Sequence, residues 1–121
     1  MKRNFDLIRH ILLKIEESDS ERMTIDDFVT DEYSPKEISF HIRLLLDVNY
    51  IEATSIRTLG SPFEEFIVQR ITMFGYEYLD SVRDPKIWTE TKAKLQKATS
   101  SVSLEIVKSV ATKIISGMLG I

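Results

Sequence analysis

Apolar residues recur every three or four positions near the start of the chain, while Lys14, Glu16 and Glu17 fall on the opposite side. This spacing predicts an amphipathic helix over residues 4–17 that turns one face to the core. The expected buried stripe consists of Phe5, Ile8, Ile11, Leu12 and Ile15.

The stretch from residue 34 to 51 carries the clearest helix signals. Ser34 can cap a helix, Pro35 suits its first position, and Glu37 stands three residues after the cap, as in a capping box. Asn49 is a residue type that often ends helices in the left-handed conformation. We therefore expect a helix that packs one side on the core and shows the other to a partner. Its expected buried side is Ile38, Ile42 and Leu45.

Shorter elements connect these two helices. A polar turn covers residues 18–22, residues 23–25 can form a short strand, and Thr24 can cap a short helix through Phe28 and Val29. Three helices with a tight turn before the third are typical of helix-turn-helix proteins.

The hydrophobic period changes after the third helix. Residues 51–58 are rich in β-branched side chains, a Leu-Gly-Ser-Pro turn follows at 59–62, and a second extended run covers 63–71. A β-hairpin is therefore expected directly after the third helix, where winged-helix proteins carry their wing.

The rest of the chain is predicted to be helical. Thr72 is expected to cap a helix to residue 83, and Asp84 with Pro85 restarts a helix to about Ala98. After a joint at residues 99–101, Ser103 is expected to cap a last helix to about residue 119. That helix is more apolar than a lone surface helix should be, so it either completes the core or, as we favour, pairs with a second chain. The residues expected at this dimer contact are Leu104, Val107, Ala111, Ile114, Met118 and Ile121.

These elements together predict a mainly α fold with a small β-hairpin, of the α+β class. A winged helix-turn-helix domain is expected over residues 1–83 and a C-terminal helical extension over residues 84–121.

Composition limits the classes of function. The 121 residues include no cysteine, which excludes disulfides, thiolate catalysis and cysteine zinc sites. Two isolated histidines, His10 and His41, do not make a metal site. No phosphate loop, nucleophile elbow, zinc-protease helix or dinucleotide fingerprint appears. We therefore expect no enzyme activity, cofactor, metal or small-molecule ligand.

Charge is unevenly distributed along the chain. Residues 1–34 carry a net charge of −4, residues 85–121 carry +4, and the whole chain carries −3. The negative net charge argues against binding of nucleic acid by electrostatic attraction alone. The sequence shows no signal peptide and no apolar run of the ~18–20 residues that a membrane span needs, so a cytoplasmic protein is expected.

The outward side of the third helix is the candidate binding surface. Arginine and lysine contact phosphates, while base edges are read mainly by arginine, asparagine and glutamine. This face carries only about half of the side chains that such contacts need, and acidic residues lie beside them. These are Glu37 and Asp47 on the helix and Glu64 and Glu65 in the expected wing. The candidate DNA-binding residues are Lys36, Ser39, Phe40 and Arg43 on the helix and Arg57 and Arg70 on the wing.

Several candidates also have plainer interpretations. Phe40 either contacts a thymine methyl or a protein partner, or packs under the first helix, and Arg43 can be an ordinary solvated arginine. His41 is expected to be a partly buried helix residue. Four aromatic residues are expected to be core residues rather than a stacking platform: Phe74, Tyr76, Tyr78 and Trp88. Four lysines are expected to form a solvated helix face rather than a phosphate contact: Lys86, Lys92, Lys94 and Lys97.

Two segments resemble those of bacterial winged-helix regulators of the antibiotic-resistance type. Residues 38–51 resemble the recognition helix of those proteins, and Ile71-Thr72 followed by Gly75 and Leu79 resembles the turn after their wing. The whole chain resembles more closely a small phage and prophage family, domain of unknown function family twenty-five thirteen. This resemblance implies a winged-helix core, a helical tail and a prophage origin, and it brings no assigned activity. It is carried by the opening Met1–Arg9, the Thr72…Gly75…Leu79-Asp80 turn, Arg83-Asp84…Trp88 and Ser103-Leu104-Glu105.

Two functions from different classes follow. The first is a small, regulator-like protein that binds double-stranded DNA as a homodimer, with its third helix in the major groove and its wing on the backbone. The second is a protein-interaction module that has the winged shape and does not bind nucleic acid. The order of the motifs favours the first, and the acidic balance favours the second.

Overall fold

A computed structural model describes residues 1–98 and 101–121 of the chain. It confirms the mainly α fold with a two-stranded antiparallel hairpin. The chain forms two compact units, Met1–Tyr76 and Glu77–Ile121. The division falls inside one helix and not at the predicted boundary after residue 83. The elements of the described residues are α1 (Phe5–Glu17), η1 (Ile25–Phe28), α2 (Pro35–Asp47), β1 (Ile51–Ile56), β2 (Glu65–Ile71), α3 (Met73–Val82), α4 (Pro85–Leu95) and α5 (Leu104–Leu119).

Helix α1 begins one residue after its cap and packs against α2 and β2. The side chain of Asn4 accepts a hydrogen bond from the backbone N–H of Leu7 (3.2 Å), which satisfies one of the free donors of the first turn. Phe5, predicted to lie in the buried stripe, is only half-buried at the first position of the helix, while Leu7, outside that stripe, is buried. The buried residues of α1 are Leu7, Ile8, Ile11, Leu12 and Ile15.

The short segment between α1 and α2 ties both to the hairpin. Met23 exchanges two backbone hydrogen bonds with Val68 of β2 (3.1 and 2.7 Å), so that a single residue extends the sheet on that side. The predicted short strand is thus reduced to one bridge. The predicted short helix is the 3-10 helix η1, and the Asp27 carboxylate at its third position accepts from the N–H of Thr24 (2.8 Å).

Helix α2 has the start and end that its sequence predicts. The Ser34 hydroxyl accepts from the N–H of Glu37, and the Glu37 carboxylate accepts from the N–H of Ser34, each at 3.3 Å, which completes a capping box. Asn49 has φ 60°, the left-handed conformation that ends a helix. The predicted buried side of Ile38, Ile42 and Leu45 is fully buried.

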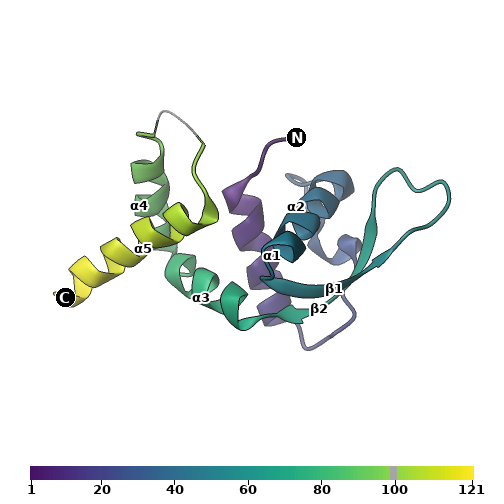
Figure 1. Ribbon diagram of the computed structural model, residues 1–121, viewed down its shortest axis with the longest axis horizontal. Helices are drawn as coiled ribbons and strands as arrows, with labels where there is room; N and C mark the ends of the chain where they lie inside the picture. Colours follow the sequence, from purple (N-terminus) through teal and green to yellow (C-terminus); the bar gives the residue numbers. More distant parts are fainter. Residues whose placement is uncertain (99–100) are drawn as a thin grey trace. The chain divides into compact units, whose positions relative to one another are not determined.

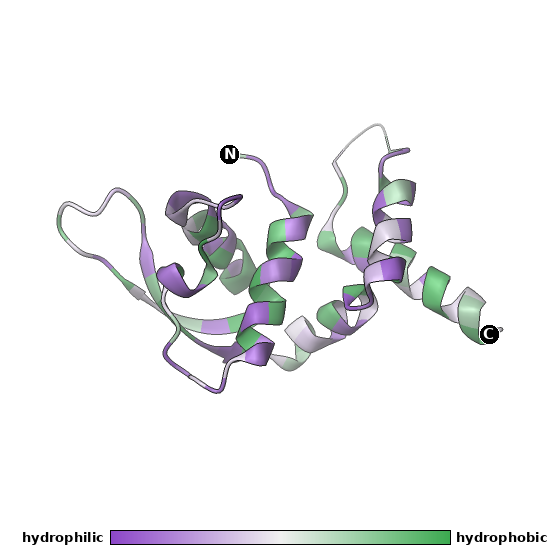
Figure 2. Ribbon diagram, turned by 180° about the vertical axis from the view of Figure 1, so that it is seen from behind, coloured by the Kyte–Doolittle hydropathy of each residue, from purple (hydrophilic) through white to green (hydrophobic). Residues whose placement is uncertain are grey.

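The hairpin follows α2 directly (Figure 1). Strand β1 pairs with β2 from Ile51 opposite Ile71 to Ile56 opposite Glu65, with an irregularity after Glu52. Both strands are shorter than predicted because turns occupy the intervening residues: the N–H of Ser61 bonds to the carbonyl of Thr58 (3.1 Å). The connecting loop extends past the start of α2 in both ribbon views (Figures 1 and 2).

The end of the hairpin is locked to the end of α2. The N–H of Thr72 donates to the carbonyl of Tyr50 (2.9 Å), and the Thr72 hydroxyl donates to the carbonyl of Asn49 (2.5 Å). The same hydroxyl accepts from the N–H of Gly75 (3.2 Å) and so caps α3, as predicted. A Cβ on Gly75 would lie 2.1 Å from the Tyr50 carbonyl oxygen, so this close approach requires glycine.

In the unit from Glu77 to Ile121, α4 and α5 pack on each other. The Asp84 side chain caps α4 and the Ser103 side chain caps α5, as predicted. Helix α4 ends at Leu95 and not at Ala98, because Lys97 and Ala98 bond to carbonyls only three residues back. Of the predicted joint after α4, residues 99 and 100 lie outside the described residues.

No helix within the described ranges 1–98 and 101–121 is long and apolar enough to cross a membrane.

Candidate nucleic-acid interface

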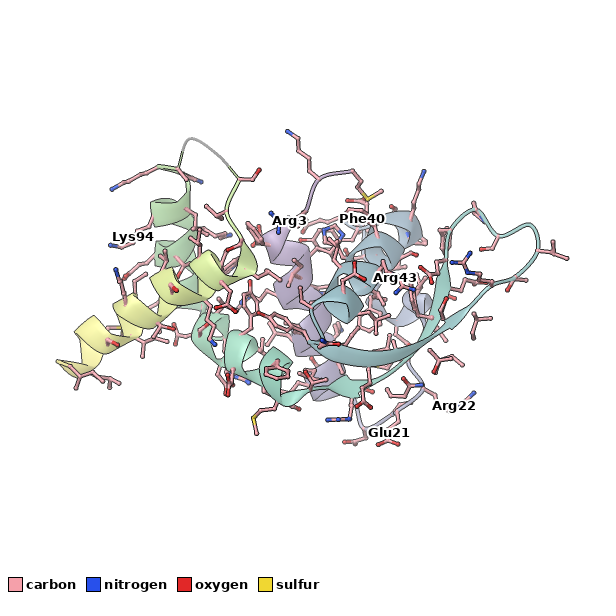
Figure 3. All side chains as sticks on the ribbon, viewed as in Figure 1. Arg3, Glu21, Arg22, Phe40, Arg43 and Lys94 are labelled. Carbon is pink, nitrogen blue, oxygen red and sulfur yellow. The ribbon has the colours of Figure 1, made fainter. Side chains whose placement is uncertain are left out.

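The six candidate DNA-binding residues differ widely in accessibility. Lys36, Arg57 and Arg70 are exposed, while Phe40 and Arg43 are intermediate. In Figure 3, Arg43 projects from α2 toward the hairpin, and Phe40 lies farther toward the start of the same helix. Helix α2 and the hairpin loop therefore border one surface, but they do not present all six side chains to it.

Ser39 was predicted to face outward, and this prediction is wrong. Its side chain is 4% exposed, and its hydroxyl donates to the backbone carbonyl of Glu64 at 2.5 Å. The start of β2 lies against α2 at this point, and a serine is small enough to fill the contact while satisfying the carbonyl. Ser39 therefore joins the helix to the hairpin and offers nothing to a ligand.

Arg43 is held by a carboxylate of the hairpin. Its Nε lies 3.1 Å from Oε1 of Glu64 and its Nη2 lies 2.5 Å from Oε2, a two-pronged pair. Its Nη1 lies 4.0 Å from the Asp47 carboxylate on the next turn of α2. The hydrogen bond to Glu64 raises the pKa of Arg43, and the hydrogen bond from Arg43 lowers the pKa of Glu64. The charge of Arg43 is thus compensated within the chain, although 43% of its side chain remains accessible.

Glu64 is the residue that sequence reasoning undervalued. Its carboxylate accepts from Arg43 and from the Ser55 hydroxyl of β1, and its backbone carbonyl accepts from Ser39. One residue thus connects α2, β1 and the start of β2. The signal in the sequence is an acidic residue in the turn region after the arginine on the helix, and such a residue can pair with the arginine as well as reduce the positive charge of the surface.

The two candidate arginines of the hairpin have different surroundings. Nη2 of Arg70 lies 2.7 Å from Oε1 of Glu52 across the hairpin, which raises the pKa of Arg70. Arg57 follows β1 in the exposed connecting loop, and its charge lowers the pKa of Glu64. Arg57 is therefore better placed than Arg70 for a contact with phosphate.

His41 and Phe40 occupy the first half of α2. Nε2 of His41 accepts from the backbone N–H of Asn4 (2.8 Å), and its Nδ1 donates to the carbonyl of Glu37 (2.7 Å). The ring is 1% exposed, more buried than predicted, and its burial lowers the pKa of His41. The Phe40 and His41 rings lie edge to face, with their centres 5.3 Å apart. His41 therefore fixes the chain before α1 and is not available to a ligand.

The unit that carries this surface is acidic. Residues 1–76 contain nine basic and fourteen acidic residues, a net charge of −5. The residues that remain as candidates for contact with an anion are Lys36, Arg43 and Arg57. Any DNA contact through this surface must therefore depend on a few side chains and on shape.

The aromatic residues do not form a platform. Tyr78 and Trp88 are buried, as a core role requires, while Phe74 and Tyr76 are 64% and 37% exposed. Among the lysines, Lys86, Lys94 and Lys97 are exposed, and Lys92 lies 5.7 Å from the centre of the Trp88 ring. In the described parts of the chain, no group of three His, Cys, Asp or Glu residues is arranged to hold a metal ion.

The residues predicted at the dimer contact separate into two groups. Leu104, Val107 and Ala111 are buried within the chain itself, so their prediction as a free contact surface is wrong. Ile114 is half-buried, and Met118 and Ile121 are 70% and 87% exposed. Hydrophobic positions continue along α5 to its last turns (Figure 2). Of the six predicted contact residues, the two that are exposed lie at the C-terminal end of the helix and beyond it.

Comparison with known proteins gives two matches. A family model described as "Hypothetical protein (DUF2513)" matches residues 2–101. An "Uncharacterized protein" of Haemophilus influenzae is 36% identical over 120 residues, which cover 98% of this chain and 99% of that protein. No solved structure matches the chain. The family resemblance predicted from the sequence is confirmed, while the prophage origin and the likeness to antibiotic-resistance regulators stay predictions.

Proposed function

The chain belongs to the family described as "Hypothetical protein (DUF2513)", and we propose that it is a winged helix-turn-helix protein that binds double-stranded DNA without catalysing a reaction. The observation that carries this proposal is the placement of α2 beside a hairpin whose loop extends past the helix (Figure 1). A helix placed beside a projecting loop can enter the major groove while the loop reaches the phosphate backbone.

Two further features support the winged arrangement. The Met23–Val68 bridge adds a third strand position to the hairpin, on the side of the segment between α1 and η1. The capping box fixes the start of α2, and the Ser39–Glu64 bond fixes the hairpin against it. The helix and loop are thereby held as one rigid surface, as a reader of DNA requires.

The proposed contacts are few. Lys36 and Arg43 on α2 and Arg57 on the loop would contact phosphate or base edges, and Phe40 would supply apolar contact. Arg70, paired with Glu52, and Ser39, buried, take no direct part. The two exposed cations, Lys36 and Arg57, predict that the logarithm of affinity falls with the logarithm of salt concentration with a slope of about −2, because the charge of Arg43 is offset by Glu64.

We also propose that two copies of the chain associate through the C-terminal half of α5. Exposed Met118, Leu119 and Ile121 form an apolar end that water solvates poorly. A two-fold pair would present two α2 helices to two half-sites, as regulators with this architecture do. A regulator-like role on DNA would place the protein in the cytoplasm.

Fluorescence anisotropy with a labelled random duplex tests the proposal. The wild-type chain should bind at low salt and lose affinity steeply as salt rises. Substitution Arg57→Ala should weaken binding and reduce the salt slope by about one. Lys86→Ala, in the exposed first turn of α4, is the matched control and should bind as the wild type does. Absence of binding at low salt would contradict the proposal.

A second candidate function is a protein-interaction module of the same shape. It is favoured by the net charge of −5 on residues 1–76 and by the compensation of Arg43 by Glu64. An acidic surface repels DNA and attracts basic protein segments. Absence of DNA binding, together with binding of a lysine-rich peptide that is lost in salt, would select this function.

A further inference from the structure

We propose that Glu64 is an internal competitor of DNA for Arg43, so that the hairpin itself lowers and sets the affinity of the helix for its target. This inference rests on the proposed DNA-binding function. It assigns Glu64 a role in recognition although its own charge repels DNA.

The geometry of the pair is that of a phosphate contact. A guanidinium binds a carboxylate or a phosphate through two parallel N–H donors, and Arg43 binds Glu64 in this way through Nε and Nη2. The same two donors cannot serve a phosphate or a guanine edge at the same time. Arg43 must therefore leave Glu64 before these two donors can contact DNA.

The rest of the guanidinium is also engaged by the chain. Its Nη1 lies at 4.0 Å from Asp47, and its Cζ lies 5.4 Å from the centre of the Phe66 ring. These contacts keep the group at the surface between α2 and the hairpin, where 43% of the side chain is accessible. Arg43 is thus preplaced on the candidate interface while its charge is masked.

Glu64 can give up Arg43 without disturbing the backbone. Its carbonyl is held by the buried Ser39 hydroxyl, and its carboxylate keeps the hydroxyl of Ser55 as a second partner. The charge of Arg57 also acts on this carboxylate. Exchange of Arg43 from Glu64 to a phosphate therefore needs only side-chain movement, and the hairpin stays in place.

This exchange predicts an unusual double-mutant pattern. In the wild type, the gain from Arg43 on DNA is offset by loss of the Glu64 pair, so Arg43→Ala should weaken binding only slightly. In Glu64→Gln the pair is neutralised, and Arg43 should contribute fully. The two substitutions are therefore expected to be strongly non-additive.

The experiment measures duplex affinity of the full chain by anisotropy at several salt concentrations, for the wild type, Glu64→Gln, Arg43→Ala and the double variant. Glu64→Gln should raise affinity on the order of tenfold, as when a charge-assisted hydrogen bond no longer has to be broken. Its salt slope should steepen by about one unit. The double variant should lose this gain. Glu65→Gln, which removes the neighbouring carboxylate without touching Arg43, is the control for a general charge effect.

Thermal melting checks that each variant is folded. If Glu64→Gln does not fold, Glu64→Asp replaces it, because aspartate keeps the charge but has a shorter side chain. Glu64→Asp should show a smaller gain in affinity of the same sign. Equal affinity of wild type and folded Glu64→Gln would overturn the inference alone. A gain that survives in the double variant, or that appears equally in Glu65→Gln, would overturn it as well. Failure of every variant, wild type included, to bind duplex would instead overturn the proposed function and this inference with it.

Discussion

The side chain of His41 in α2 accepts a hydrogen bond from the backbone N–H of Asn4, thirty-seven residues earlier in the chain, at 2.8 Å. A backbone N–H only donates, so Nε2 of His41 must carry no proton. The carbonyl of Glu37 only accepts, so the proton lies on Nδ1. The fold therefore requires the neutral form of His41, and this bond anchors the cap residue of α1 to α2.

This requirement predicts that stability depends on pH. Burial lowers the pKa of His41 in the folded chain below the usual 6.5. The unfolded chain therefore binds more protons below pH 6.5, and the free energy of unfolding should fall as pH drops from 6.5 toward the folded pKa. Thermal melting at pH 7.5 and pH 5.5 measures this change. His10→Gln should keep the pH dependence and His41→Gln should lose it; pH-independent melting of the wild type would contradict the account.

Gly75 should tolerate no side chain. An added Cβ would meet the Tyr50 carbonyl oxygen at 2.1 Å and Cγ2 of Ile71 at 2.7 Å, so α3 would have to move away from the hairpin. Gly75→Ala should lower the free energy of unfolding by about 1–3 kcal/mol, the usual cost of overpacking. Gly117→Ala, in α5 with open space around it, is the control and should stabilise by up to ~1 kcal/mol through helix propensity. Chemical denaturation distinguishes the two, and equal effects would refute the packing argument.

Ser39 should matter for stability because its hydroxyl satisfies the Glu64 carbonyl between α2 and β2. Ser39→Ala leaves that acceptor without its partner and should cost about 1–3 kcal/mol. Ser109→Ala, at an exposed position of α5, should change the unfolding free energy by less than ~0.5 kcal/mol. A neutral Ser39→Ala would show that the buried hydroxyl contributes nothing to the joint between helix and hairpin.

The two halves of α5 should respond differently to substitution. Multi-angle light scattering of the wild type should give twice the chain mass of 14.0 kDa. The double variant Met118→Glu with Ile121→Glu should give a monomer with unchanged melting temperature, because both side chains are exposed. Ser109→Glu, also exposed and in the first half of the helix, should remain a dimer.

Val107→Ala should keep the dimer but lose roughly 2 kcal/mol of stability, since this side chain is fully buried. A monomeric wild type at high concentration would remove the proposed dimer.

Local sequence signals predicted most of the fold. The caps at Ser34, Asp84 and Ser103, the left-handed Asn49 and the buried spacing in α2 depend on neighbours within a few residues, and all are present. Where the sequence failed, contacts between distant segments decide. A helical period cannot show that the fold buries Leu7 more completely than Phe5, because both positions carry an apolar side chain.

The candidate site was harder to predict for the same reason. Ser39 and Arg43 lie on the side of α2 that the hairpin approaches, and only the position of β2 determines which side chain it buries and which it pairs. In the sequence, Glu64 is a charge in a turn; in the fold, it bonds to two elements. The C-terminal helix shows the same limit, since its period marks an apolar face without showing that Leu104, Val107 and Ala111 are buried while Met118 is exposed.

Amide chemical-shift mapping on the isotope-labelled full chain with a saturating duplex tests the central claim most directly. The account predicts shifts at residues 36–43 of α2 and 57–64 of the hairpin loop, together with a change at the Nε resonance of Arg43 as it leaves Glu64. Shifts confined to the lysines of α4, or no shifts at low salt, would contradict the assignment of this surface to DNA.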